Sequence, residues 1–188
     1  LLAGVEPPHH GQADSVADAR ARMAEADVDY HAGRYDVALQ KLDAIERSFA
    51  EVTYQPLSNE LALERSFALF ALGRLDEADR AGRKALRGAA RWRQRELLAE
   101  TFIHLVLTVG YEQRRIEVGL GYARMAWWLV RGTDLEPNLL GHRGSVLALA
   151  GEFDRAEADL REAIRLLGDS SESEVAAAEG NLGAVLYS

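Results

Sequence analysis

The sequence has no cysteine and only four prolines among its 188 residues. Without cysteine, these residues form no disulfide, no thiolate metal site and no cysteine nucleophile. The scarcity of proline excludes collagen-like and proline-rich chains. Basic residues are in deficit too, with 22 Lys and Arg against 30 Asp and Glu. The resulting net charge of -8 argues against a general nucleic-acid binder.

Long apolar runs are also missing. The most apolar stretch, residues 97–109, is interrupted by Glu100 and His104, and it is shorter than the ~20 residues that a membrane span needs. Residues 1–4 have neither a methionine nor the basic region of a signal peptide. We therefore expect an excerpt of a longer protein, in a cytoplasmic setting and with no membrane partner.

The residues that are present are typical of helices. Hydrophobic residues make up 48% of the chain and charged residues 28%, which favours a packed core over disorder. From residue 13 onward Ala, Leu, Arg and Glu dominate, and no stretch alternates apolar with polar residues for long enough to predict a strand. Residues 1–12, with Pro7 and Pro8, are predicted to be an N-terminal loop, and residues 13–188 an all-α array.

Three segments of the chain repeat one pattern. Residues 33–39, 73–79 and 151–157 each read Gly, polar, apolar, Asp, any residue, Ala. The first two glycines are 40 residues apart and the next interval is 78, close to two periods. This spacing predicts a degenerate copy of the pattern over residues 112–130.

Each copy is expected to form a helix hairpin. Its glycine ends the first helix, where a left-handed backbone costs little, and its Asp caps the second helix through a side-chain oxygen. Its alanine lets the two helices approach closely. Stacked hairpins bury the apolar faces that one hairpin cannot, which predicts a right-handed α-solenoid of about four hairpins and the first helix of a fifth. In chain order these residues are Gly33, Asp36 and Ala38; Gly73, Asp76 and Ala78; and Gly151, Asp154 and Ala156.

From about Ala19 to the C-terminus the pattern resembles the tetratricopeptide repeat (TPR) family. The resemblance implies a helical solenoid that binds a protein or a peptide and has no catalytic activity. Its strongest stretch matches that family's spacing of small and large residues with Leu140, Gly144, Leu147, Gly151, Phe153, Ala156, Leu160 and Ala163.

A weaker resemblance covers residues 141–163 and 180–183. These segments are similar to TPR arrays that precede caspase-like CHAT protease domains in actinobacterial proteins, whose catalytic residues cannot be assigned to any position here. The pattern restarts after residues 169–171. Because Leu182 and Leu186 are too apolar for a capping helix, we expect the array to continue, or to self-associate through this open C-terminal end.

Candidate catalytic and metal sites have ordinary interpretations. His9 and His10 lack a histidine partner at helical spacing and are expected to lie in a loop. Ser145 follows a glycine but has neither the preceding strand nor the second glycine of a nucleophile elbow. His142, beside Arg143, is expected to be solvated. We therefore expect no catalytic, cofactor or metal site, and we expect that the chain is not an enzyme.

A basic run surrounds Trp92. It is either a contact for nucleic acid or an acidic partner, or a solvated outer face, and the negative net charge favours the solvated face. The run consists of Arg83, Lys84, Arg87, Arg91, Arg93 and Arg95.

The inner surface, lined in the TPR family by the first helix of each hairpin, is the best candidate binding site. Its mixture of aromatic, aliphatic and a few polar residues suits an extended or helical peptide. TPR domains that clamp a C-terminal carboxylate use Lys and Asn there, whereas this chain has Met23, Asp27, Leu63 and Phe67, so that clamp is not expected. The predicted groove residues are Tyr30, His31, Phe67, Phe70, His104, Thr108, Tyr111 and Asn138. For Phe67 and Phe70, packing in the core between repeats is the alternative.

These features predict a non-catalytic interaction module that binds a peptide or a neighbouring domain of the same parent protein. Two alternatives stay open. The array is the regulatory or substrate-recruiting part of a CHAT-type peptidase, or it is the sensor region of a bacterial transcription regulator. The residues that follow the array in the parent would distinguish the three.

Overall fold

A computed structural model describes residues 5–49, 54–168 and 172–187. It divides into two compact units, unit 1 (Leu1–Thr101) and unit 2 (Phe102–Ser188), which are treated separately below. All the regular structure in the described ranges is helical, which confirms the predicted all-α fold.

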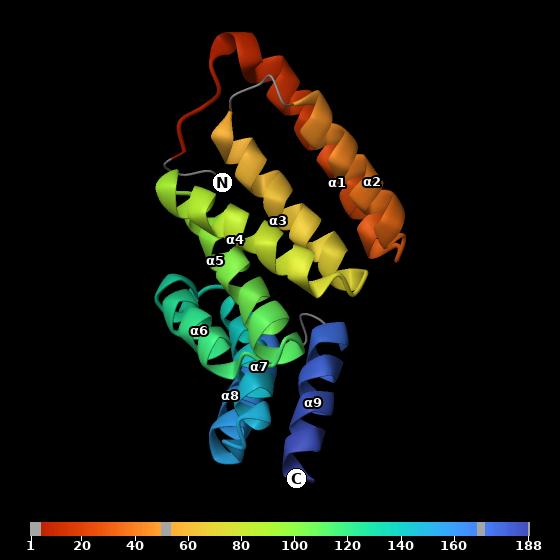
Figure 1. Ribbon diagram of the computed structural model, residues 1–188. Coiled ribbons are helices and arrows are strands. Elements are labelled where there is room, and N and C mark those ends of the chain that lie inside the picture. Colours follow the sequence, from red (N-terminus) through yellow and green to blue (C-terminus); the bar gives the residue numbers. More distant parts are fainter. Residues whose placement is uncertain (1–4, 50–53, 169–171, 188) are drawn as a thin grey trace. The chain divides into compact units, whose positions relative to one another are not determined.

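Unit 1 contains two helix hairpins and the start of a third (Figure 1). In each hairpin the two helices lie against one another along their length. A core of aliphatic residues, with Tyr54 at its edge, joins the helices of the two hairpins. The helices are α1 (Ala13–His31), α2 (Tyr35–Ser48), α3 (Gln55–Ala71), α4 (Leu75–Arg91) and the first part of α5 (Arg95–Leu105), preceded by the short 3-10 helix η1 (His10–Gln12).

Glycine makes both hairpin turns of unit 1, as predicted. Gly33 and Gly73 have φ angles of 75° and 71°, a left-handed conformation that costs residues with a Cβ more. Ala38 and Ala78 are buried where the second helix of each hairpin meets the first. The contact that the repeated alanine was expected to make is therefore present.

The predicted Asp caps are wrong. The helices α2 and α4 begin two residues earlier than a capping Asp would require, so their N-cap residues are Arg34 and Arg74, which make no side-chain cap bond. Asp36 and Asp76 instead lie in the first turn, where a negative charge is favoured by the helix dipole. Asp154 has the same place in the first turn of α8.

Unit 2 contains the rest of α5 and four further helices. The segment η2 (Val106–Glu112) continues α5 as a π-helix. Gly151 turns the chain between α7 and α8 with a φ of 75°, and Ala156 is fully buried, as the repeated pattern predicts. Residues 169–171 lie outside the described residues, and a further helix begins directly after them at Glu172, where the pattern is predicted to restart. The helices are α6 (Ile116–Val130), α7 (Glu136–Leu149), α8 (Phe153–Leu167) and α9 (Glu172–Leu186).

The degenerate copy forms a hairpin from η2 and α6 by other means. No glycine stands at its turn, where Arg114 adopts a φ of 54°. Instead, two glycines meet inside the hairpin: a Cβ on Gly119 would lie 2.3 Å from the Cα of Gly110. The close approach that alanine provides elsewhere is therefore provided here by paired glycines.

Candidate functional site

Unit 1 brings three of the predicted groove residues together. Tyr30 and His31 end α1, and Phe67 lies on α3, with the Tyr30 and Phe67 ring centroids 6.5 Å apart. Tyr30 and His31 meet edge to face at 5.5 Å. His31 is exposed, and Tyr30 and Phe67 are half-buried, so the rings are held in place and yet remain accessible. We call these residues, with Asp27 and Glu64, the unit 1 face.

The unit 1 face is acidic. Burial, together with the nearby carboxylates of Asp27 and Glu100, raises the pKa of Glu64 to about 7. Burial also raises the pKa of Tyr30. His31 opposes part of the upward shift in the pKa of Glu64, and its Nδ1 lies 3.1 Å from Oδ1 of Asp27. A cation that approaches Glu64 would therefore stabilise the ionised form of its carboxylate.

The rest of the inner side of α3 is already occupied. Glu60 accepts two hydrogen bonds from Arg20, at 2.9 and 3.1 Å. Leu63, which was expected to point into the groove, is 1% exposed and lies in the core. Phe70 also packs against the core cluster of α1 to α4. Like Phe67, which packs against the core residues Leu63 and Ala85, Phe70 is half-buried.

In unit 2, two predicted groove residues lie inside the protein. His104 is 5% exposed and Thr108 is fully buried. They are 3.3 Å apart, His104 Nε2 to Thr108 Oγ1, and satisfy each other's polar atoms. Tyr111, three residues further on, is exposed. The surface predicted around His104 and Thr108 is therefore incorrect, and of this group Tyr111 is the accessible residue.

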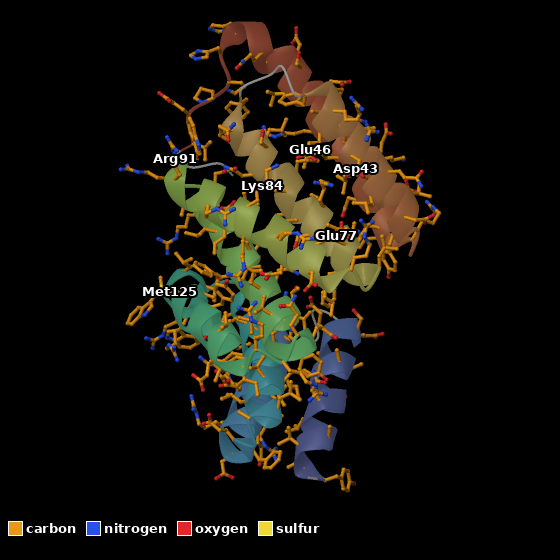
Figure 2. The ribbon with its side chains drawn as sticks, in the orientation of Figure 1. Asp43, Glu46, Glu77, Lys84, Arg91 and Met125 are labelled. Carbon is orange, nitrogen blue, oxygen red and sulfur yellow. The ribbon has the colours of Figure 1, made fainter. Side chains whose placement is uncertain are left out.

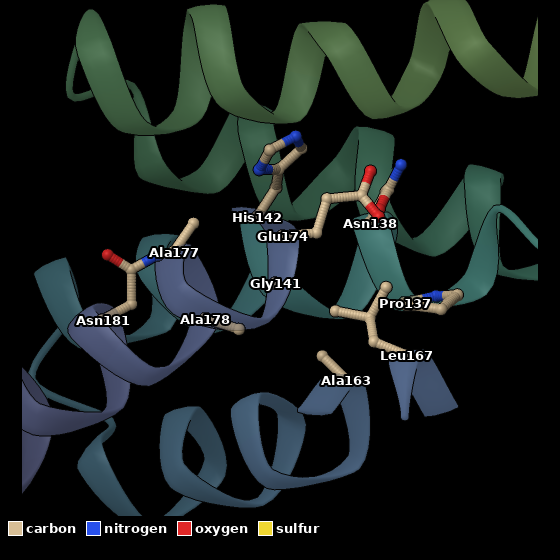
Figure 3. A pocket seen from close by; sticks show the side chains of 10 residues that line it. All are labelled: Pro137, Asn138, Gly141, His142, Ala163, Leu167, Glu174, Ala177, Ala178 and Asn181. Atoms are coloured by element: carbon tan, nitrogen blue, oxygen red, sulfur yellow. The ribbon is translucent and has the colours of Figure 1, made fainter. Parts of the chain in front are cut away.

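Asn138 lines a pocket of about 210 Å³ in unit 2 (Figure 3). The pocket lies between α7, α8 and α9. In the view of Figure 3 the side chains of Asn138, His142 and Glu174 lie on the upper side, and Ala163 and Leu167 on the lower side. Its remaining lining residues are Pro137, Gly141, Ala177, Ala178 and Asn181.

His142 is not solvated, contrary to expectation. Its side chain is half-buried at the pocket, and burial lowers its pKa to about 4. The imidazole is therefore neutral at pH 7 and adds no positive charge to the pocket. Nearby, Asn181 donates a hydrogen bond of 3.1 Å to Ser145 Oγ, which holds α9 against α7.

Glu64 and His142 were not among the predicted groove residues, although the sequence contains a signal for both. Glu64 precedes the turn glycine Gly73 by nine residues, and His142 precedes Gly151 by the same number. Both are polar residues at one repeat position on the first helix of a hairpin. Reading each register position across the copies would have identified them.

Part of the basic run forms ion pairs with carboxylates of neighbouring helices. Lys84 Nζ lies 2.9 Å from Glu46 Oε1 (Figure 2). Arg65, which is not part of the run, bridges Glu46 and Asp43 between α2 and α3. Arg91 is exposed at the end of α4. These pairs link neighbouring helices, as expected for a solvated outer face.

Part of the apolar surface of the C-terminal helix α9 is buried against α7 and α8. Val185 is buried against Leu147 and Leu160, and Leu182 packs beside it. Leu186 remains 53% exposed. The open apolar end is therefore smaller than predicted, and self-association through it remains a prediction.

Metal clusters and membrane-spanning helices are absent from the described ranges. No group of three or more His, Asp or Glu side chains there is arranged to hold a metal ion. No helix of the described residues combines the length and the apolar character that crossing a membrane requires.

Comparison with known proteins identifies the fold. No protein-family model and no curated protein sequence matches the chain. Solved structures do: kinesin light chain TPR-like repeats from Podosopora anserina superpose with a TM-score of 0.71 at 12% identity, over 92% of this chain and 87% of that one. BtubC (BKLC) from P. vanneervenii gives 0.71 at 19% identity, over 94% and 81%.

A thermophilic TPR protein of Thermus thermophilus gives a TM-score of 0.57 at 20% identity, over 90% of each chain. At these identities the likeness concerns the fold alone, and the fold is a TPR-like α-solenoid, as predicted. The weaker resemblance to CHAT-associated arrays is not shown by these comparisons and stays a prediction.

Proposed function

We propose that the chain is a non-catalytic interaction module that binds a polypeptide segment on the unit 1 face. The segment belongs to a separate protein or to a neighbouring domain of the same parent. One observation carries the proposal: Tyr30, His31 and Phe67 form an accessible aromatic cluster on the first helices of two successive hairpins. In the TPR-like fold, interaction with proteins or peptides is the common role of such repeats.

The physical argument rests on how binding energy is distributed. Aromatic anchors that are held by their neighbours lose little conformational freedom on binding and supply most of the energy of an interface. Tyr30 is fixed by ring contacts with Tyr35 at 5.3 Å and with Phe67. The face therefore needs no rearrangement to accept a ligand.

The charge of the face selects the partner. Asp27 and Glu100 oppose the ionisation of Glu64, so a Lys or Arg side chain placed among them would relieve repulsion as well as form new bonds. An acidic segment or a C-terminal carboxylate would meet repulsion. We therefore infer that the bound segment is basic and contains an apolar or aromatic residue for the Tyr30–Phe67 cluster.

The alternatives concern the parent protein. A regulatory or substrate-recruiting role beside a CHAT-type peptidase, or a sensor role in a transcription regulator, would each use the same face for an intramolecular partner. The sequence that follows the array in the parent would separate them.

A display selection of random peptides on the whole chain tests the proposal. Selected peptides should be enriched in Arg and Lys and bind the Tyr30→Ala variant about 30-fold more weakly, since losing an aromatic anchor costs ~2 kcal/mol. Val28→Ala is the matched control, because Val28 lies on the same helix and is 64% exposed. Equal affinity of both variants, with unchanged circular dichroism, would remove the unit 1 face from the account.

A further inference from the structure

The pocket in unit 2 has a chemical asymmetry. Its floor is apolar, with buried Pro137, Ala163 and Leu167. Its rim is polar, with the amides of Asn138 and Asn181 and the carboxylate of Glu174. A site with one apolar wall and polar groups opposite suits a ligand that is itself amphipathic.

The charge of the pocket has one sign. Glu174 is the lining residue that carries a formal charge at pH 7 among those that the structure describes, since His142 is kept neutral by burial. Carboxylate and amide oxygens on the same side present several hydrogen-bond acceptors to a single donor group.

The pocket is open because α7 lacks a side chain at Gly141. A Cβ built on Gly141 meets no atom within 4 Å, so packing does not require glycine there. Gly144, one turn later, is different: its Cβ would lie 2.8 Å from Cγ of Leu160. Glycine within a helix is less stabilising than alanine. Close packing therefore explains the glycine at position 144. At position 141 no packing contact requires glycine, and the absence of a side chain leaves the pocket open.

We propose that this pocket binds the side chain of an arginine from a partner polypeptide. The methylene stem lies over Ala163 and Leu167, and the guanidinium donates hydrogen bonds to Glu174 and Asn138 (Figure 3). Arginine fits better than lysine, because its planar fork of five donors matches a carboxylate beside an amide oxygen. The site lies wholly in unit 2 and deepens the proposed function, since it defines one residue of the partner.

The test is a titration of the isotopically labelled whole chain with acetyl-Gly-Arg-Gly-amide, followed by NMR. We expect saturable shifts confined to residues 137–142, 163–167 and 174–181, which contain all the lining residues. The citrulline analogue, which has the same shape without the charge, should bind at least about tenfold more weakly, because a charge-assisted hydrogen bond contributes more than a neutral one. Equal binding of the two peptides, or shifts spread outside these residues, would overturn the proposal.

Variants make the test specific. Gly141→Leu should fill the pocket, abolish the saturable shifts and leave the helix intact, since the added side chain meets no atom at its Cβ. Glu174→Gln, at an exposed position, should weaken binding about tenfold. Gly180→Ala is the control: it lies on α9, outside the lining residues, and its Cβ also meets open space. Unchanged binding by Gly141→Leu would overturn the assignment.

The two proposals fail separately. If the arginine peptide does not bind but display-selected peptides still depend on Tyr30, the pocket proposal alone is wrong. If it binds the pocket and no selected peptide depends on Tyr30, the unit 1 face is wrong. Tyr30→Ala should leave the tripeptide titration unchanged, because Tyr30 belongs to unit 1.

Discussion

The two units use one repeat position in opposite chemical ways. Glu64 in unit 1 and His142 in unit 2 both lie nine residues before a turn glycine, and both are half-buried. Burial moves each towards its neutral form: the pKa of Glu64 is raised to about 7 and that of His142 is lowered to about 4. The side chain at this repeat position is therefore desolvated in both units. Its residue type decides whether burial raises or lowers its pKa.

The hairpins also differ in the residues at two shared positions, the contact between the two helices and the turn that joins them. Three of them bring their helices together over alanine and turn on glycine, whereas the hairpin of η2 and α6 meets through Gly110 and Gly119 and turns on Arg114. Substitutions at these positions test the comparison, from the largest expected effect to the smallest.

Gly119→Ala should have the largest effect. The added Cβ would lie 2.3 Å from the Cα of Gly110, and backbone cannot move aside as a flexible side chain can. We expect a loss of about 3 kcal/mol or more in the free energy of unfolding, measured by denaturant titration. Gly121→Ala is the control, because its nearest neighbour is the end of the Arg124 side chain at 3.8 Å. Similar stability of the two variants would mean that this close contact does not exist.

Ala156→Leu and Ala78→Leu should each cost about 1–3 kcal/mol by overpacking. Both alanines are 0% exposed at the same place in their hairpins, one in each unit. Matching losses would show that the units share one packing device. A loss under ~0.5 kcal/mol at either position would mean that this hairpin is assigned incorrectly.

Glu64→Gln should stabilise the protein at pH 8 by about 1–3 kcal/mol. The folded pKa of about 7 lies above the unfolded value near 4.5, so ionised Glu64 disfavours folding once the pH exceeds 4.5, and fully so above 7. The gain should fade as the pH falls from 7 towards 4.5. Glu179→Gln, at an exposed position on α9, is the control.

His142→Gln should show the opposite pH dependence. The folded pKa of about 4 lies below the unfolded value of 6.5, so the wild type loses stability as the pH falls from 6.5 towards 4. Glutamine removes that loss. At pH 5 the variant should gain about 1–2 kcal/mol relative to its effect at pH 8. A difference that does not change between pH 5 and pH 8 would contradict the burial of His142.

Arg114→Gly should have the smallest effect, a gain of about 0.5–1 kcal/mol. A left-handed backbone costs a non-glycine residue ~1–2 kcal/mol, part of which the greater flexibility of glycine in the unfolded chain offsets. Arg93→Gly, at a φ of 55° in unit 1, should behave alike. Thermal unfolding would measure both, and a loss of stability would show that the arginine side chains have a role of their own.

Much of the fold could be predicted from the sequence, because spacing determines it. The positions of Gly33, Gly73 and Gly151 fix three hairpin turns, and the interval of 78 locates the degenerate one. The Asp caps could not be predicted well, since a shift of two residues in the helix start moves Asp36 from the cap into the first turn.

The site was predicted less completely, for a geometric reason. Side chains one or two positions apart on a helix face different directions. An error of one residue in the position therefore assigns a core residue to the groove, or a groove residue to the core. Leu63 was expected to be accessible and lies in the core, whereas its neighbour Glu64 is close enough to Asp27 for their charges to interact. His104, expected in the groove, is buried, and its Nε2 lies 3.3 Å from Oγ1 of Thr108, four residues further along the helix.

The central claim is that the inner face of unit 1, and not the outer basic run, binds the partner. The most direct measurement is the affinity of one display-selected peptide for wild type, Phe67→Ala and Arg91→Glu, with helical content checked by circular dichroism. We predict about 30-fold weaker binding for Phe67→Ala and a change within about twofold for Arg91→Glu. Loss of binding in Arg91→Glu, with Phe67→Ala unaffected, would contradict the account and place the functional surface on the outer face.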